Sequence, residues 1–310
     1  MNLTMRIYHD EDDYWRIREF LREVFLLNGR RELSWQAYRF DYWRWQGTEN
    51  LGHGRLERDV FLWETPDGRI GAVLNPESKG VAFLQVHPGL RTRELEEEMI
   101  VVAEQHLAIS RPSGPRKLWI FAHEHDDLRQ DILTRRGYTK CDYTEVHLRW
   151  PLSIPIPEVP VAAGYTVRAL GDVEELPARS LASWKAFHPD EPGDQHEGWE
   201  WYRTIQRAPL YCRDLDLVAV APDAPLRFAS FCTVWFDDVT RTGAFEPVGT
   251  ASAYQRRGLG KAVMCEGLRR LKRLGATMAY VGSEAPDTLA FYTSVGFTVC
   301  ELSQPWTKEL

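Results

Sequence analysis

The stretch that decides the fold runs from Gly243 to Ala276 and reads GAFEPVGTASAYQRRGLGKAVMCEGLRRLKRLGA. It predicts a strand that ends at Thr250, a loop over Gln255–Gly260 and a helix that reaches about Leu274. Gly275 suits the position just after a helix, because glycine adopts the left-handed backbone conformation there at little cost. Three apolar residues recur at helical spacing and give the helix one apolar face: Met264, Leu268 and Leu271.

The start of this helix has the composition of an anion site. Gly258 and Gly260 remove side chains where the backbone would approach a ligand, and the free N–H groups of the first turn would point at it. Arg256, Arg257 and Lys261 add positive charge around the same turn. The residues therefore predict a cradle for a pyrophosphate.

Two common phosphate-binding loops do not fit this cradle. A Walker A loop has a glycine where Gln255 stands and Ser or Thr after the lysine, whereas Ala262 follows Lys261. A dinucleotide fingerprint has a third glycine where Val263 stands, and an acidic residue about twenty positions later.

The pattern Q-x-x-G-x-G at Gln255–Gly260 resembles the coenzyme A pyrophosphate loop of the GNAT N-acetyltransferase superfamily. A second signature, Pro286–Phe297 with Tyr292 at its centre, is similar to the ending of that superfamily, and the resemblance covers roughly Gly164–Leu310. It implies acetyl-CoA as cosubstrate, no metal, and these residues around the cofactor: Val248, Gly249, Thr250, Gln255, Arg256, Arg257, Gly258, Leu259, Gly260 and Lys261. Ala285 stands where the family usually has an asparagine, so one contact to the pantetheine arm is absent or replaced.

The resemblance also implies two catalytic residues. Tyr292 would donate a proton to the leaving thiolate, and Glu246, on the strand before the loop, would take the proton of the amine. Alternatives for the base are a water chain or the terminal carboxylate of Leu310, with Glu246 then only binding a cationic substrate. The backbone of Val248 and Thr250 would pair with the pantetheine arm like an added strand.

The chain reads as two copies of one plan. Pro151–Ala163 contains four prolines in its first ten residues and predicts a stiff linker. Gly137-Tyr138-Thr139-Lys140-Cys141 mirrors Gly296-Phe297-Thr298-Val299-Cys300 at an offset of 159 residues (296 − 137). We therefore expect a degenerate GNAT-like domain over 1–150, a linker over 151–163 and a catalytic GNAT domain over 164–310.

Each copy should hold a mixed, mostly antiparallel central sheet flanked by helices, an α/β or α+β class. The helix near the N-terminus is expected to bury Trp15, Phe20 and Val24. The expected strands are 60–64, 70–74 and 80–86 in the first copy and 215–221, 228–236 and 243–250 in the second.

The first copy departs from the site pattern. Glu94–Glu98 place acidic side chains at the corresponding helix start, where they would repel a pyrophosphate. Leu133 stands where Tyr292 would align. His123 and His125 lie two apart, a spacing more typical of surface residues than of a metal site.

Composition limits the classes of function. A net charge of −7 argues against nucleic-acid binding, and no stretch approaches the roughly 18 apolar residues of a membrane span. Five scattered cysteines without a CxxC pair favour a cytoplasmic protein. We expect transfer of an acetyl group to a small-molecule or peptide amine by a monomer or homodimer. A non-catalytic CoA-binding or protein-interaction module and an enzyme for another acyl-CoA stay open.

Overall fold

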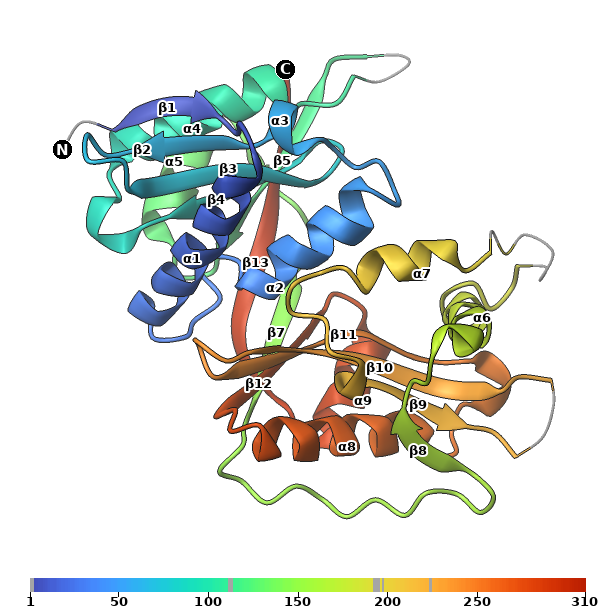
Figure 1. Ribbon diagram of the computed structural model, residues 1–310. Helices are drawn as coiled ribbons and strands as arrows, with labels where there is room; N and C mark the ends of the chain where they lie inside the picture. The colour runs from blue at the N-terminus through green and yellow to red at the C-terminus, as the bar shows by residue number, and fades with distance from the viewer. Residues whose placement is uncertain (1–2, 111–113, 192–195, 197, 223–224) are drawn as a thin grey trace. The chain divides into compact units, whose positions relative to one another are not determined.

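The computed structural model describes residues 3–110, 114–191, 196, 198–222 and 225–310 (Figure 1). They form two compact units. Unit 1 comprises the chain up to His147 together with Gly282–Ala285 and Cys300–Leu310, and unit 2 comprises Leu148–Val281 with Pro286–Val299. Both units are mixed sheets with helices packed on them, so the expected fold class is confirmed.

Unit 1 is built around β1, β2, β3, β4, β5 and β13 in that spatial order. Neighbouring strands in this order are antiparallel except β4 and β5, which are parallel. Its elements are β1 (Thr4–Ile7), α1 (Glu11–Leu27), α2 (Ala37–Tyr42), the π-helix η1 (Trp43–Thr48), α3 (Leu56–Asp59), β2 (Phe61–Glu64), β3 (Ile70–Ser78), β4 (Val81–Val86), η2 (Pro88–Leu90), α4 (Arg93–His106), β5 (Lys117–His123), α5 (Asp127–Arg135) and β6 (Thr139–Lys140). β7 (Glu145–Pro151), β12 (Met278–Ser283) and β13 (Thr298–Glu309) have residues in both units.

Two hydrophobic cores lie on the two faces of the unit 1 sheet. Because successive strand residues point to opposite faces, Phe61 and Trp63 join the core under α4 and α5, whereas Leu62 joins the core under α1. Figure 1 shows α1 on one side of this sheet and α4 with α5 on the other.

Unit 2 repeats the plan with β8, β9, β10, β11 and β12 as successive neighbours. β11 and β12 are the parallel pair, and the other three pairs are antiparallel. Figure 1 shows α8 on one face of this sheet and α6 and α7 on the other. The remaining elements are β8 (Thr166–Ala169), η3 (Val173–Glu175), α6 (Leu176–Phe187), α7 (Glu200–Ile205), η5 (Arg213–Leu215), β9 (Asp216–Val220), β10 (Phe228–Asp237), β11 (Thr242–Thr250), η6 (Ser252–Tyr254), α8 (Leu259–Arg273) and α9 (Pro286–Val295).

The expected strands agree with β2, β3, β4, β9, β10 and β11 to within a few residues. One expectation for α1 is wrong: Trp15 is 45% exposed, and the buried face carries Tyr14, Ile17 and Leu21 beside Val24. Residues 14, 17, 21 and 24 follow the helical repeat, and Trp15 lies about 100° away from that face. The boundaries 1–150, 151–163 and 164–310 stay a prediction about domains. The compact units are drawn differently, since Cys300–Leu310 belongs to unit 1.

No helix in the described part of the chain is both long and apolar enough to cross a membrane.

Candidate active site

The strand that carries Glu246 contains a break in its register. β10 and β11 pair regularly from Asp237 with Thr242 to Val234 with Phe245, and again from Cys232 with Val248. Glu246 and Pro247 fall in the break. Proline has no N–H to donate to a sheet ladder, so a bulge is a position where it can be accommodated.

The bulge lies where exposure changes along the strand. Thr242–Phe245 are buried, whereas Glu246–Thr250 are half-buried. A Cβ on Gly267 of α8 would meet the Phe245 ring at 2.7 Å, so Phe245 packs against α8. Glu246, the next residue, is therefore expected to point toward the opposite face, where α6 and α7 lie.

Beyond the bulge, one edge of β11 has no strand partner among the described residues. The parallel pairing with β12 ends at Ala244 with Tyr280. On the other edge, the N–H of Ala251 donates to the carbonyl of Ala229 in β10. Because neighbouring strand residues direct their backbone groups to opposite edges, the N–H and C=O groups of Val248 and Thr250 point away from β10.

The loop after β11 arranges the backbone for an anion. Arg256 and Gly258 both have left-handed backbone conformations, with φ of 63° and 75°. Such residues next to ordinary ones turn successive N–H groups toward one point. α8 begins at Leu259 after Gly258, which has no side chain to cap the helix, so the first-turn N–H groups have no capping side chain among the described residues.

The two predicted glycines have different reasons to be glycine. A Cβ on Gly258 would meet nothing within 4 Å, so the left-handed backbone is what requires glycine there. A Cβ on Gly260 would lie 3.0 Å from the Phe291 ring and 3.2 Å from Oγ1 of Thr250. Gly260 therefore permits close packing of α8 against α9 within unit 2.

Most of the predicted basic side chains are held by the protein. Arg257 donates to the Tyr165 hydroxyl at 2.7 Å and to the Ala253 carbonyl at 3.1 Å. Lys261 donates to the Ser294 carbonyl at 2.8 Å. Arg256 is exposed and makes no ion pair within the described ranges. Arg256 is thus the residue of this group best placed to meet a ligand.

Tyr292 lies in α9 and is 5% exposed. Burial raises the pKa of Tyr292 well above its usual range, and the charge of Glu246 raises it further. The phenol is therefore protonated at neutral pH. Among the residues the structure describes, none forms a hydrogen bond with its hydroxyl. The site thus brings a protonated hydroxyl within electrostatic range of a carboxylate.

Comparison with known proteins gives a family match over part of the chain. Residues 177–297 match the model of the acetyltransferase (GNAT) family. The expected resemblance to the GNAT acetyltransferase family is therefore confirmed for this segment of the chain. The prediction of an N-acetyltransferase is thereby confirmed.

Two relatives of this protein have names that state an activity. It is 28% identical over 264 residues to a mycothiol acetyltransferase of Segniliparus rotundus, covering 81% of this chain and 94% of the relative. It is 28% identical over 193 residues to a mycothiol acetyltransferase of Salinispora arenicola, covering 60% of each chain.

Two solved structures share the fold of the whole chain. A GCN5-related N-acetyltransferase from Sphaerobacter thermophilus superposes with a TM-score of 0.67 at 18% identity, covering 99% of this chain and 95% of that one. A tandem GNAT protein from the clavulanic acid biosynthesis pathway has a TM-score of 0.68 at 16% identity, covering 99% and 98%.

Sequence reasoning missed a buried polar cluster at the start of β9 in unit 2. Asp216 has no exposed surface and accepts hydrogen bonds from the hydroxyls of Tyr202, at 2.6 Å, and Tyr211, at 2.8 Å. Arg179, also fully buried, lies 3.4 Å from Asp216 and 3.8 Å from the centroid of the Phe231 ring. The only signal in the sequence was an arginine within an apolar helix, at 179.

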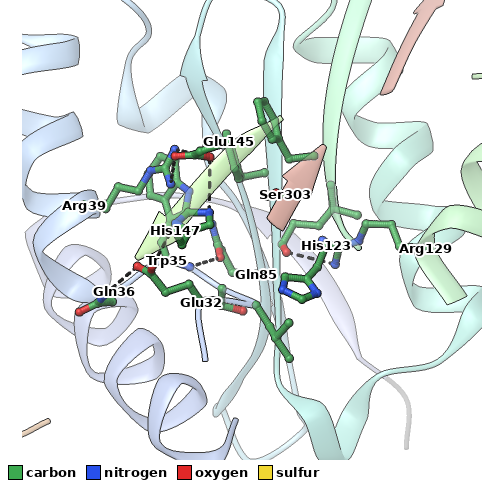
Figure 2. A pocket seen from close by; sticks show the side chains of 15 residues that line it. Glu32, Trp35, Gln36, Arg39, Gln85, His123, Arg129, Glu145, His147 and Ser303 are labelled. Atoms are coloured by element: carbon green, nitrogen blue, oxygen red, sulfur yellow. Dashed lines mark hydrogen bonds and ion pairs between the residues drawn. The ribbon is translucent and has the colours of Figure 1, made fainter. Parts of the chain in front are cut away.

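Unit 1 has a cavity beside the carboxyl-terminal part of β4, between residues of β4, β5 and the segment before α2. Its volume of about 30 Å³ admits water but is far below that of an ordinary ligand pocket. Figure 2 shows Arg39, Glu145 and His147 on one side of it and His123 with Arg129 on the other.

The charges around this cavity are paired with one another. Arg39 lies 2.6 Å from Glu77 and 3.1 Å from Glu145. His147 lies 3.0 Å from Glu32. Burial opposes the charge on His147, but Glu32 and Glu145 outweigh it and raise the pKa of His147 to about 9. The cavity is thus lined by a closed ion-pair network.

No group of three or more potential metal ligands occurs among the described residues. His123 is buried and faces Glu301, whereas His125 is mostly exposed. Leu310, the other candidate for the base, is in unit 1, where its N–H donates to the Arg116 carbonyl at 2.8 Å.

Proposed function

We propose that unit 2 transfers the acetyl group of acetyl-CoA directly to a primary amine, with Tyr292 as the acid and Glu246 as the base. The observation that carries this is the protonated Tyr292 hydroxyl within electrostatic range of Glu246. The proposal keeps Glu246 rather than Leu310 because Glu246 shares a unit with Tyr292 and acts on its pKa.

The backbone at the start of α8 would bind the pyrophosphate of the cosubstrate. Gly258 and the residues after it offer N–H groups, and Arg256 adds an exposed positive charge. Val248 and Thr250 offer N–H and C=O groups along the edge of β11 beyond its pairing with β12. The amide-containing pantetheine arm would pair with this edge as an added strand does.

The proton balance assigns one transfer to each side chain. Glu246 accepts the proton that the amine nitrogen must lose as it forms a bond to the acetyl carbonyl carbon. Tyr292 gives its proton to the sulfur as the carbon–sulfur bond breaks. The backbone near Val248 would donate a hydrogen bond to the carbonyl oxygen as it gains charge.

The acceptor is proposed to be a small-molecule amine related to mycothiol. This follows the names of relatives, one of which is matched over 94% of its length. The ring pair Trp184 and His188, stacked at 3.9 Å, and the exposed ring of Phe187 would form part of the wall on the α6 side.

Release of CoA with a panel of amines tests the proposal. Glu246→Gln should lower kcat about 100-fold and flatten the acidic limb of the kcat/KM profile, because the amide accepts no proton. If Glu246→Gln keeps the acidic limb of the pH profile but has a raised KM for the amine, Glu246 binds the cationic substrate and is not the base. If the protein binds CoA but forms no CoA from acetyl-CoA with any amine of the panel, it would be a non-catalytic module.

A further inference from the structure

The peptide carbonyl of Glu246 has its own hydrogen-bond donor. Nε1 of Trp235 donates to this carbonyl oxygen at 2.5 Å, and Trp235 is 1% exposed. The carbonyl belongs to the residue that precedes Pro247 in the bulge, where the ladder between β10 and β11 is interrupted. The indole thus supplies a contact at the point where regular sheet hydrogen bonding is lost.

The indole is supported from behind. The Tyr211 ring packs edge-on against Trp235 with a centroid distance of 6.3 Å. The Tyr211 hydroxyl is held by Asp216 at 2.8 Å, and the same carboxylate oxygen accepts from Tyr202 at 2.6 Å. A buried carboxylate with several donors holds its neighbours in one arrangement. The chain of contacts therefore runs from Asp216 through Tyr211 and Trp235 to Glu246.

We infer that Trp235 is a positioning residue for the base, because its indole N–H fixes the bulge from which the Glu246 carboxylate reaches the amine. The inference rests on the proposed function. A bulged segment has fewer ladder bonds to define its backbone angles, so a side-chain anchor has more influence there. A displacement of about 1 Å in a reacting group can cost up to about 100-fold in rate.

The test is a double-mutant cycle with Trp235→Phe and Glu246→Gln. Trp235→Phe keeps an aromatic ring and removes the donor. It should lower kcat about 10-fold with the KM for acetyl-CoA unchanged, since the lost contact acts on the base and not on the cofactor. In the Glu246→Gln background it should have almost no further effect, because there is no base left to position.

Trp63→Phe is the matched control. Trp63 is fully buried in unit 1, and its indole donates one hydrogen bond, to Glu98 at 3.0 Å. It should reduce stability without changing kcat. If Trp235→Phe proves poorly folded, Tyr211→Phe is the substitute variant. It removes the hydrogen bond to Asp216 that holds the Tyr211 ring against Trp235. It should show a smaller loss of kcat that also disappears in the Glu246→Gln background.

The outcomes separate the two hypotheses. An equal loss of kcat from Trp235→Phe in both backgrounds would show a general structural role and overturn the positioning role alone. Normal kcat in Glu246→Gln would overturn the proposed base, and the positioning role with it. A raised KM for acetyl-CoA in Trp235→Phe would place the indole with the cofactor and also overturn the inference.

Discussion

The free N–H groups at the helix start are treated in opposite ways in α4 of unit 1 and in α8 of unit 2. In α4 the Thr92 hydroxyl accepts the N–H of Leu95. Glu96, fully buried in the first turn, is bonded to Arg91 and Arg129. In α8 no side chain caps the first turn. Unit 1 thus supplies its own anion at a helix start where unit 2 leaves room for a ligand's anion.

The open strand edges differ in the same way. In β4 the carbonyl of Leu84 accepts a hydrogen bond from Nη2 of Arg129 at 3.2 Å, beyond the end of pairing with β5. In β11 the corresponding edge at Val248 and Thr250 carries only the long contact from Gln255 to the Thr250 carbonyl, 3.4 Å, among the bonds the structure records for it. The sequence predicts that unit 1 is a degenerate copy, and a side chain of unit 1 occupies the edge that the proposed function leaves to the cofactor in unit 2.

The positions proposed to react in unit 2 carry different residues in unit 1. Ala82 pairs with Ile120 in unit 1, and Gly243 pairs with Ala279 in unit 2; Ile120 and Ala279 differ by the repeat offset of 159 (279 − 120). Counting along the strands places Gln85 at the position of Glu246. Gln85 is buried, and its amide bonds to the Trp35 N–H and to Asn75. Leu133, aligned with Tyr292, is fully buried in a core.

The largest effect that would test this comparison is expected at Tyr292. Tyr292→Phe should lower kcat by about 10 to 10³-fold with little change in the KM for acetyl-CoA, because the hydroxyl matters mainly as the thiolate leaves. Steady-state kinetics with a fixed amine measures it.

Tyr138→Phe is the matched control in unit 1. Tyr138 is buried, and its hydroxyl donates to Glu104 at 3.2 Å. The variant should keep full kcat. A loss of rate from Tyr138→Phe as large as that from Tyr292→Phe would show that unit 1 takes part in the reaction.

The second effect concerns the ion-pair network of unit 1. The pKa of His147 is raised to about 9, from about 6.5 in an unfolded chain. A raised folded-state pKa contributes stability that is complete below the unfolded pKa and is lost as pH rises through the folded one. On the order of 3 kcal/mol should therefore disappear between about pH 6.5 and pH 10.

The measurement compares the free energy of unfolding of the wild type with that of His147→Gln at pH 7 and at pH 10. Amide hydrogen exchange in unit 1 reports this free energy. The difference should shrink at the higher pH. His123→Gln is the control, because burial lowers the pKa of His123 and leaves it neutral over this range. A pH-independent difference for His147→Gln would show that His147 is not charged in the folded protein.

Local chemistry made much of the site predictable. The loop at Gln255–Gly260 and the Tyr292 signature are each contiguous in sequence, and the structure brings Gly260 of the loop close to Phe291 and to Thr250 at the end of β11. Pro247 also carries a readable signal, since proline inside a strand predicts an irregular ladder. These features depend on neighbours within a few residues.

The missed features depend on pairs far apart in the chain. Trp235 meets Glu246 through the register of two strands, and Tyr202 meets Asp216 through helix packing. The ladder between β13 and β5 joins residues at least 180 positions apart, such as Trp306 and Ile120 (306 − 120 = 186). No local sequence pattern encodes such a partner. A domain boundary predicted at the proline-rich segment therefore could not show that Cys300–Leu310 belongs to unit 1.

The third effect tests whether the chain has one cofactor site. Calorimetric titration should give one CoA per chain, and Gly258→Val should weaken binding by about 2 kcal/mol, roughly 30-fold. A side chain at this left-handed position strains the loop and obstructs backbone approach to the pyrophosphate. Gly258 is preferable to Gly260, whose replacement would also collide with Phe291.

Gly68→Val is the control for backbone strain. Gly68 lies in unit 1 with φ of 83°, and a Cβ there would meet nothing within 4 Å. It should lower stability about as much as Gly258→Val and leave CoA affinity unchanged. Two equivalent CoA sites per chain would show that Glu96 and Arg129 do not fill the slot of unit 1.

The smallest effect is expected at the cap of α4. Thr92→Ala removes the acceptor of the Leu95 N–H and should cost about 1 kcal/mol of unfolding free energy, while Thr92→Ser should keep most of it. Neither variant should change CoA affinity, because Glu96 still pairs with Arg129 at 3.0 Å and occupies the first turn. Thermal unfolding and CoA titration of the same samples separate the two quantities. A weaker CoA affinity in Thr92→Ala would mean that the start of α4 contributes to cofactor binding. The contrast between a self-capped α4 and a ligand-binding α8 would then fail at its first element.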